Sequence, residues 1–287
     1  MTRHLYRSFA TVEQLDAEYA IHLSVADFDG YLDSYARRSA AARPTLDGTY
    51  DLSYGPTSAE SFDYFAAPGE RGAPLVVYIH GGYWYAGAKA DWSFVAEGLV
   101  ERGVNVAVEE YALCPSVSMS EIVRQHRALV AHLYRQADEL GHDRDRIVVV
   151  GHSAGGHGAA EVLRTDWSAY GLPDDLVHSA VGISGLYDLA PLPFTFVAPH
   201  LQLTGREIDG LSPQRCAPTT DARLLVTYGT KETAEFRRQS SDFAAACRSA
   251  GPAVEELALE RDHYDIVDEL WTADGAITGW IASAVGR

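Results

Sequence analysis

The chain has 287 residues, of which 47% are hydrophobic and 22% are charged, a composition that excludes disordered, collagen-like and coiled-coil proteins. Its 23 lysines and arginines against 40 aspartates and glutamates give a formal net charge of −17, and no basic stripe offsets it. Since such a surface repels phosphate backbones and anionic lipids, we expect neither a nucleic-acid partner nor a membrane partner.

The beginning of the chain and its cysteines indicate a cytoplasmic protein. Charged residues such as Arg3, Arg7 and Glu13 interrupt residues 1–16, so this segment lacks the apolar run of a secretory signal. No stretch approaches the roughly 18 apolar residues that a membrane span needs. The three cysteines form no CxxC pair and leave an odd count for disulfides, which is typical of reduced thiols; they are Cys114, Cys216 and Cys247.

Residues 1–45 carry helical signals. The segment Thr11–Tyr19 predicts a first short helix. Four apolar residues then follow at spacings i, i+3, i+4 and i+7, which predicts the buried stripe of a second helix. They are Phe28, Tyr31, Leu32 and Tyr35. We expect these helices to form an extension that packs on the rest of the protein as a partial lid.

The remainder predicts an α/β domain. Residues 50–54 and 60–65 alternate in polarity on either side of Gly55 and Pro56, which predicts an antiparallel edge. Short apolar runs separated by helical periodicity then predict a mostly parallel sheet with helices on both faces. These runs are residues 75–79, 104–108, 147–150, 181–184, 224–228 and 254–259.

No repeat or linker divides residues 60–287, so we expect a single domain spanning 1–287, with a cap-like insertion at about 189–215. Parallel sheets bind ligands beyond the carboxyl ends of their strands. The residues that follow the apolar runs are therefore the candidates for chemistry.

A Gly-x-Ser-x-Gly motif, residues 151–155, lies between a predicted strand and a predicted helix that continues through Val162. This tight turn requires small residues on both sides of Ser153, and it exposes the serine hydroxyl at a helix N-terminus. Ser153 is therefore the candidate nucleophile.

A serine nucleophile needs a histidine base and an acid that orients it, here in the chain order Ser, acid, His. Only His263 lies past the last predicted strand, whereas His178 and His200 are interpreted as structural. Glu232 follows the strand at 224–228 and is the favoured acid. The alternatives Asp188 and Asp262 stay open.

An oxyanion site is predicted from His80-Gly81-Gly82-Tyr83-Trp84, which follows the strand at 75–79. The glycines let the backbone of Gly81 and Gly82 turn its N–H groups toward a substrate, and the N–H of Ala154 supplies a complementary donor. His80 is interpreted as a brace for this loop.

The chain has no HExxH motif and no carboxylate or cysteine ligand set around His152 and His157, so we expect no metal. It also lacks the GxGxxG and GxxxxGK[ST] loops that bind phosphates. We therefore expect no nucleotide cofactor.

Five segments together resemble the arylformamidase (kynurenine formamidase) branch of the α/β-hydrolases: HGGYW at 80–84, GHSAGGH at 151–157, SGLYDLAPL at 184–192, KETAEFRRQS at 231–240 and DHYDIVDEL at 262–270. The resemblance implies the α/β-hydrolase fold and hydrolysis of the formamide of an aryl amine. It also implies that Ser153, Glu232 and His263 occupy the triad positions. Tyr85 and Ala88 depart from the basic and acidic residues expected there, so the rim of the pocket is expected to differ.

An aryl substrate would stack on aromatic residues near the predicted site, namely Tyr83, Trp84, Tyr85, Tyr187 and Tyr264, with Phe194 and Phe196 as a cap. The expected partner is thus a small aromatic acylated or formylated amine. Two alternatives stay open: an esterase or tailoring hydrolase for small aromatic esters and amides, and a hydrolase-fold binding protein without turnover. A homodimer is also open.

Overall fold

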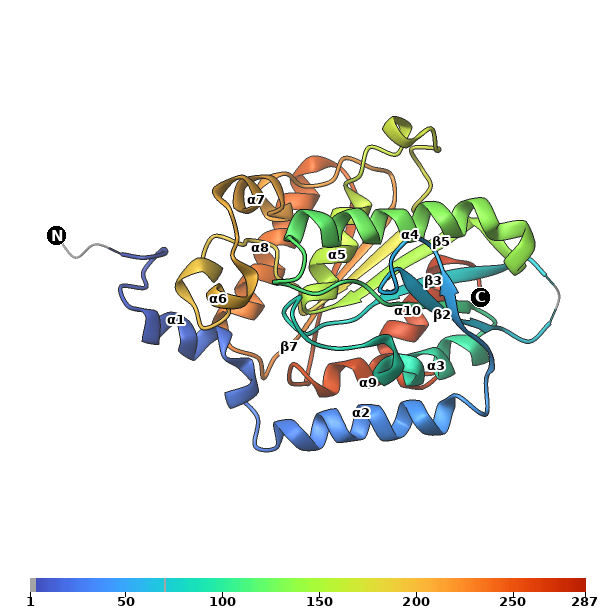
Figure 1. The fold of residues 1–287 in the computed structure, drawn as a ribbon, viewed down its shortest axis with the longest axis horizontal. Helices are drawn as coiled ribbons and strands as arrows, with labels where there is room; N and C mark the ends of the chain where they lie inside the picture. The colour runs from blue at the N-terminus through green and yellow to red at the C-terminus, as the bar shows by residue number, and fades with distance from the viewer. Residues whose placement is uncertain (1–3, 70) are drawn as a thin grey trace.

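The computed structural model describes residues 4–69 and 71–287, which form an eight-stranded sheet with helices on both faces (Figure 1). The strand order is β1-β2-β4-β3-β5-β6-β7-β8, in which β3 to β8 run parallel and β1 and β2 are antiparallel at one edge. The predicted mostly parallel sheet is therefore confirmed. The strands are β1 (Asp47–Ser53), β2 (Ser61–Ala66), β3 (Ala73–Ile79), β4 (Asn105–Glu109), β5 (His142–His152), β6 (Ser179–Ile183), β7 (Arg223–Gly229) and β8 (Ala253–Leu259).

Burial along the strands explains the apolar runs. Every residue of β3, β4 and β6 is buried, as expected for central strands that helices cover on both faces. The edge strand β1 instead alternates between exposed and partly buried residues. The sheet thus has a continuous apolar centre, whose carboxyl edge carries the loops described below.

The helices lie in two layers. Figure 1 shows α4 and α5 above the sheet and α3 and α9 below it, with α2 outermost on the lower side. None of the helices in the described part of the chain is long and apolar enough to cross a membrane. The helices are α1 (Val12–Tyr19), α2 (Phe28–Ala42), α3 (Ala96–Glu101), α4 (Met119–Leu140), α5 (Ala154–Leu163), α6 (Ala198–Leu201), α7 (Gly205–Gly210), α8 (Ala234–Ala250), α9 (Asp268–Trp271) and α10 (Ala276–Ala284).

Local signals set the helix ends. A capping box begins α1, in which the side chains of Thr11 and Gln14 each accept a hydrogen bond from the other residue's backbone N–H. The side chain of Ser118 caps α4, which ends at Gly141 with a left-handed φ of 87°. The sequence thus encodes both the start of the N-terminal helices and the length of the longest helix.

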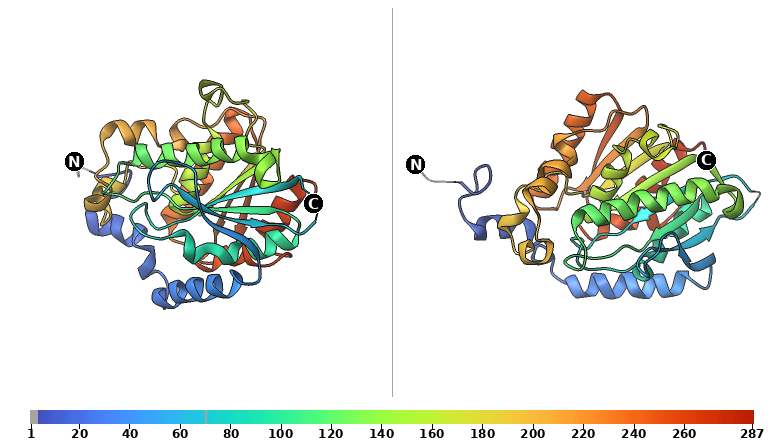
Figure 2. Two further views of the ribbon diagram at one scale, coloured as in Figure 1. Left: turned by 45° about the vertical axis from the view of Figure 1, so that its right-hand side comes forward. Right: turned by 45° about the horizontal axis from the view of Figure 1, so that its top comes forward.

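The N-terminal helices are tied to loops at the carboxyl edge of the sheet. Figure 2 shows from two further angles that α1 lies beside α6, and α2 runs along the same side of the molecule as α1. The hydroxyl of Tyr19 donates to Glu235 at 2.9 Å, and that of Tyr35 donates to the carbonyl oxygen of Tyr264 at 2.6 Å. The extension is therefore attached to the start of α8, which follows β7, and to the loop that follows β8.

The free energy of unfolding should fall as the pH drops from 6.5 to 4 because of His142, the first residue of β5. Its Nε2–H donates to the carbonyl of Leu133 at 3.1 Å, and burial lowers its pKa from 6.5 to about 4. In this window the unfolded chain binds a proton that the folded chain does not, so folding loses about 1.4 kcal/mol per pH unit. Urea unfolding at pH 7 and 4.5 should show that His142→Gln loses about 2 kcal/mol less stability than the wild type. Equal losses in both proteins would contradict this assignment.

Candidate active site

Ser153 occupies a strained turn between β5 and α5. Its φ of 56° and ψ of −118° lie in a region that non-glycine residues rarely adopt. A Cβ on Gly151 would collide with the carbonyl of Gly155, and a Cβ on Gly155 would collide with that of Ile79. Both glycines of the motif are therefore required for the turn. The backbone N–H of Ser153 donates to the carbonyl of Ile183 at 2.8 Å, which fixes the turn to β6.

His263 and Glu232 meet beyond the ends of β8 and β7. The Nδ1–H of His263 donates to Oε2 of Glu232 at 3.0 Å, and both side chains are buried. The other carboxylate oxygen accepts from the hydroxyl of Ser184 and from the N–H of Gly229, each at 2.6 Å. Because the carboxylate only accepts, this contact places the imidazole proton on Nδ1 and leaves Nε2 as a proton acceptor.

The alternative acids are held elsewhere. Asp188 accepts from the hydroxyl of Tyr6 at 2.7 Å, and Asp262 accepts from the hydroxyl of Tyr31 at the same distance. Neither carboxylate is paired with His263 among the described residues. The geometry therefore favours Glu232 as the orienting acid.

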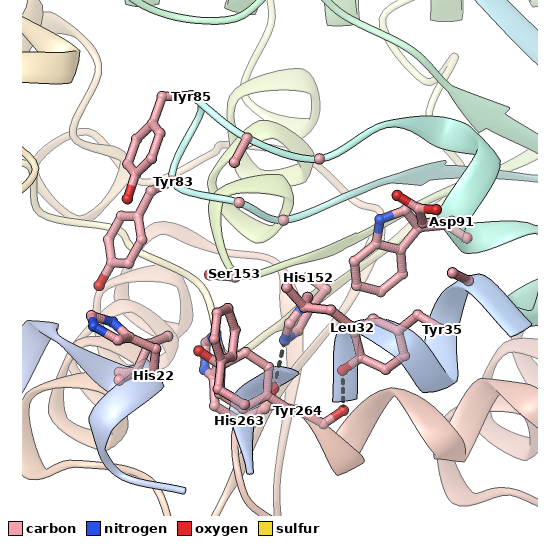
Figure 3. A pocket seen from close by; sticks show the side chains of 18 of the residues that line it. His22, Leu32, Tyr35, Tyr83, Tyr85, Asp91, His152, Ser153, His263 and Tyr264 are labelled. Atoms are coloured by element: carbon pink, nitrogen blue, oxygen red, sulfur yellow. Dashed lines mark hydrogen bonds between the residues drawn. The ribbon is translucent and has the colours of Figure 1, made fainter. Parts of the chain in front are cut away.

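Ser153 and His263 line the same cavity, and Figure 3 shows Ser153 near the middle of the view with His263 below it. The structure thus places Ser153, Glu232 and His263 at the carboxyl edge of the sheet, just after β5, β7 and β8, with Glu232 bonded to His263 and with Ser153 and His263 lining one cavity. Such an arrangement can activate a serine hydroxyl for nucleophilic attack.

His152 supports the His263 loop, a role that sequence reasoning missed. Its Nε2–H donates to the carbonyl of His263 at 2.8 Å, and the two ring centroids lie 4.7 Å apart. Burial, together with the neighbouring His263, lowers the pKa of His152 well below its usual value. Tyr31 also donates a hydrogen bond to Asp262, and Tyr35 donates one to the carbonyl of Tyr264. Hydrogen bonds from side chains therefore hold three successive residues of this loop, 262–264.

The predicted oxyanion loop follows β3. Gly82 has a φ of 119°, and a Cβ there would collide with the carbonyl of Ala86. Within residues 4–69 and 71–287, no acceptor takes the N–H of Gly81, Gly82 or Ala154, so these donors are free for a ligand. Tyr111 donates to the carbonyl of His80 at 2.9 Å and stacks on its ring at 4.4 Å, which fixes the peptide that carries the Gly81 N–H.

The cavity beside Ser153 has a volume of about 570 Å³. Of the five aromatic residues predicted to contact substrate, Tyr83, Tyr85 and Tyr264 line it, and Phe196 lines it as well. Tyr85 also stacks on His200 with the ring centroids 4.3 Å apart. An aryl group therefore has several ring faces within its reach.

Trp84 and Tyr187 do not line the cavity, so their predicted substrate contacts are wrong. Trp84 is fully buried edge-on against His157, because its left-handed backbone (φ 59°) directs the side chain into the core. Tyr187 is fully buried and stacks on Phe243, with the ring centroids 4.0 Å apart. Its ring occupies space that a Cβ on Gly182 or Gly185 would fill. Phe194 is 38% exposed and also lies outside the lining.

Several lining residues come from segments that the sequence did not assign to the site. The helix stripe of α2 contributes Phe28, Leu32 and Tyr35, and the segment Lys89–Val95 contributes Asp91 and Trp92. The apolar periodicity of α2 predicts that one face of the helix is buried, but it does not predict which part of that face lines a cavity.

Among the described residues, no group of three or more His, Cys, Asp or Glu is arranged to hold a metal ion.

Comparison with known proteins identifies relatives over most of the chain. The family model BD-FAE matches residues 63–165. Kynurenine formamidase from Danio rerio is 31% identical over 253 residues, 86% of this chain and 85% of that protein. Kynurenine formamidase from Drosophila melanogaster is 28% identical over 73% of this chain and 72% of that protein.

Solved structures share the fold. A putative thioesterase from Silicibacter sp. superposes with a TM-score of 0.81 and 29% identity, covering 96% of this chain and 99% of that one. A hyperthermophilic esterase from the archaeon Pyrobaculum calidifontis has a TM-score of 0.73, with 90% and 92% of the two chains covered. At 18% identity, this second likeness shows the α/β-hydrolase fold alone.

Proposed function

Because the chain belongs to the kynurenine formamidase family, we propose that it is a serine hydrolase that cleaves the formamide of an N-formylkynurenine-like aryl amine. The products are the free amine and formate. The observation that carries this proposal is the paired Glu232 and His263 beside the strained turn at Ser153, in a cavity walled by aromatic rings.

In the first step, the hydroxyl oxygen of Ser153 attacks the formyl carbon while Nε2 of His263 takes the hydroxyl proton. The Nδ1–H···Oε2 contact with Glu232 supports the positive charge that forms on the imidazole. The carbonyl oxygen becomes negative and receives hydrogen bonds from the free backbone N–H groups of the oxyanion loop and of Ala154. Such donors are each worth about 3 kcal/mol in the barrier.

In the second step, Nε2–H of His263 protonates the amine nitrogen, and the carbon–nitrogen bond breaks. The aryl amine leaves, and the formyl group stays on Ser153 as an ester. His263 then takes a proton from water, whose oxygen attacks the ester carbon, and formate is released as the proton returns to Ser153. The same histidine thus acts as base and acid in turn.

The aromatic lining favours an aryl leaving group. Tyr83 and Tyr264 present rings to the cavity, and the hydroxyl of Tyr83 donates to the carbonyl of Tyr19 at 2.5 Å, which fixes that ring. A pre-oriented ring loses little freedom when a substrate ring stacks on it.

Three further expectations stay predictions: a cytoplasmic location, a homodimer, and a changed pocket rim at Tyr85 and Ala88.

Relative rates for three substrates test the proposed reaction. We expect kcat/KM for N-formylkynurenine and formanilide to exceed that for p-nitrophenyl acetate by about tenfold or more, since the free N–H donors and aromatic walls suit a small formyl group on an aryl amine. Liberated formate is measured with each formamide. A rate for the acetate that is orders of magnitude higher would favour the esterase alternative instead.

A further inference from the structure

The cavity has two chemically different ends. Figure 3 shows Tyr83, Tyr85 and His22 on one side of Ser153, and Asp91 and Tyr35 on the other. The first end is aromatic and carries no carboxylate among its labelled residues. The second end carries a carboxylate beside aromatic rings, so the two ends differ in the charge that they accept.

The charges that line the cavity are negative. Its lining includes Asp91 and Asp33 but no lysine or arginine from the described residues. No donor or cation in the described part of the chain pairs with either carboxylate. The adjacent Lys89 is already committed, with its Nζ 2.6 Å from both Asp51 and Asp63.

The histidines of the cavity do not offset these carboxylates. Burial lowers the pKa of His152 well below its usual value, so this ring stays neutral. His263 is paired with Glu232. His22 lies at the opposite end, where its ring packs against Phe28 and Phe196 at 5.8 and 5.6 Å.

The surroundings of Asp91 suit an ammonium group. Burial raises the pKa of Asp91, with an opposing contribution from the nearby His80 and a supporting one from Glu110. Water therefore solvates the charged form of Asp91 poorly, and a cation in the cavity would stabilise it. Tyr35 and Trp92 line the same cavity with their ring centroids 4.9 Å apart. Aromatic faces attract cations through their quadrupoles, so rings and carboxylate favour the same ligand charge.

We propose, building on the proposed function, that this cavity selects aryl formamides whose side chain carries an alkylammonium group, with Asp91 as its counter-ion. A carboxylate on the same side chain has no cation in the lining to pair with. In a zwitterionic substrate, the ammonium group therefore faces Asp91 and the carboxylate faces solvent. Asp91 is in this way a specificity-determining residue.

Three 2-formamidophenyl ketones, which share the same reacting formamide and differ only in the ketone side chain, test the proposal. Their ketone side chains are 2-aminoethyl (cationic), 2-carboxyethyl (anionic) and propyl (neutral). We expect kcat/KM to fall from the cationic to the neutral to the anionic ketone, with the cation favoured over the anion by about tenfold or more at low salt. The preference should shrink in 0.5 M salt, because salt screens the charges. Equal rates, or a preference for the anion, would overturn the proposal.

Two variants assign the preference to a residue. Asp91→Asn should lower the cation-to-anion ratio of kcat/KM about tenfold. The matched control is Asp29→Asn, which removes the same charge from an exposed residue of α2 that does not line the cavity. Its cation-to-anion ratio of kcat/KM should equal that of the wild type. Equal ratios in the two variants would overturn the role of Asp91. If none of the three ketones is hydrolysed, the proposed function itself fails, whereas hydrolysis without charge preference removes this inference alone.

The wild-type ratio keeps the proposal testable even if Asp91→Asn does not fold. A second measurement uses Ser153→Ala and calorimetry with the 2-aminophenyl products of the cationic and anionic ketones. The cationic product should bind about tenfold more tightly. Equal affinities would contradict ammonium recognition without involving turnover.

Discussion

Replacing Ser153 with alanine should lower kcat/KM for N-formylkynurenine by about 10⁴- to 10⁶-fold, because no other group at this position forms the covalent formyl ester. Covalent labelling by a fluorophosphonate probe should disappear in the same variant. The fold should persist, since the backbone N–H of Ser153 still donates to the carbonyl of Ile183 and both flanking glycines remain. Single-turnover kinetics and mass spectrometry of the labelled protein measure the two losses.

A matched control for this variant is Ser168→Ala, which changes an exposed serine outside the cavity. It should retain wild-type turnover and labelling. Persistent hydrolysis by Ser153→Ala, at a rate comparable to that of the control, would rule out the serine mechanism. It would also remove the basis for the formyl ester intermediate.

The sheet was predictable because its central strands are short, strongly apolar segments that stand out in the sequence. Val148, Val149 and Val150 form an uninterrupted β-branched run, which favours a strand buried on both faces. The ends were less clear: β5 begins at His142, five residues before the predicted run, in a stretch whose side chains are partly exposed. Pairing with a neighbouring strand, rather than side-chain composition, extends the strand there.

The catalytic candidates were predictable because they follow strands. Ser153, Glu232 and His263 each lie just beyond a strand's carboxyl end, where parallel topology brings loops together. The choice of acid was not settled by sequence alone. Asp262 is adjacent to His263 in the chain, yet it turns toward Tyr31, and adjacency along a loop does not determine side-chain direction.

The cavity wall was less predictable, because an apolar stripe does not reveal what covers it. Tyr187 and Tyr264 both lie in loops that follow strands, yet Tyr187 fills the core over two glycines while Tyr264 lines the cavity. Likewise, α2 was expected to pack as a lid, and its Leu32 and Tyr35 line the cavity itself. Such assignments depend on contacts between segments that are far apart in the sequence, such as Tyr187 with Phe243 and Tyr35 with the carbonyl of Tyr264.

Changing Glu232 to glutamine should lower kcat about 10⁴-fold with little change in KM, because the amide keeps the size of the side chain but reverses one hydrogen bond. The glutamine oxygen can still accept from Ser184 and Gly229, so its NH₂ group faces Nδ1 of His263. A donor there stabilises the tautomer whose proton is on Nε2, which cannot take the proton of Ser153.

The matched variant for this effect is Asp262→Asn, which alters the carboxylate next to His263 in the chain. The asparagine oxygen can still accept from the backbone N–H of Tyr264, so we expect a loss of less than tenfold. Stopped-flow measurement of kcat and KM for both variants on one formamide separates the two acids. A large loss in Asp262→Asn together with near-normal turnover in Glu232→Gln would transfer the orienting role to Asp262. The opposite result would tie turnover to the hydrogen bond between Glu232 and the imidazole, because only that contact fixes which ring nitrogen is free to accept a proton.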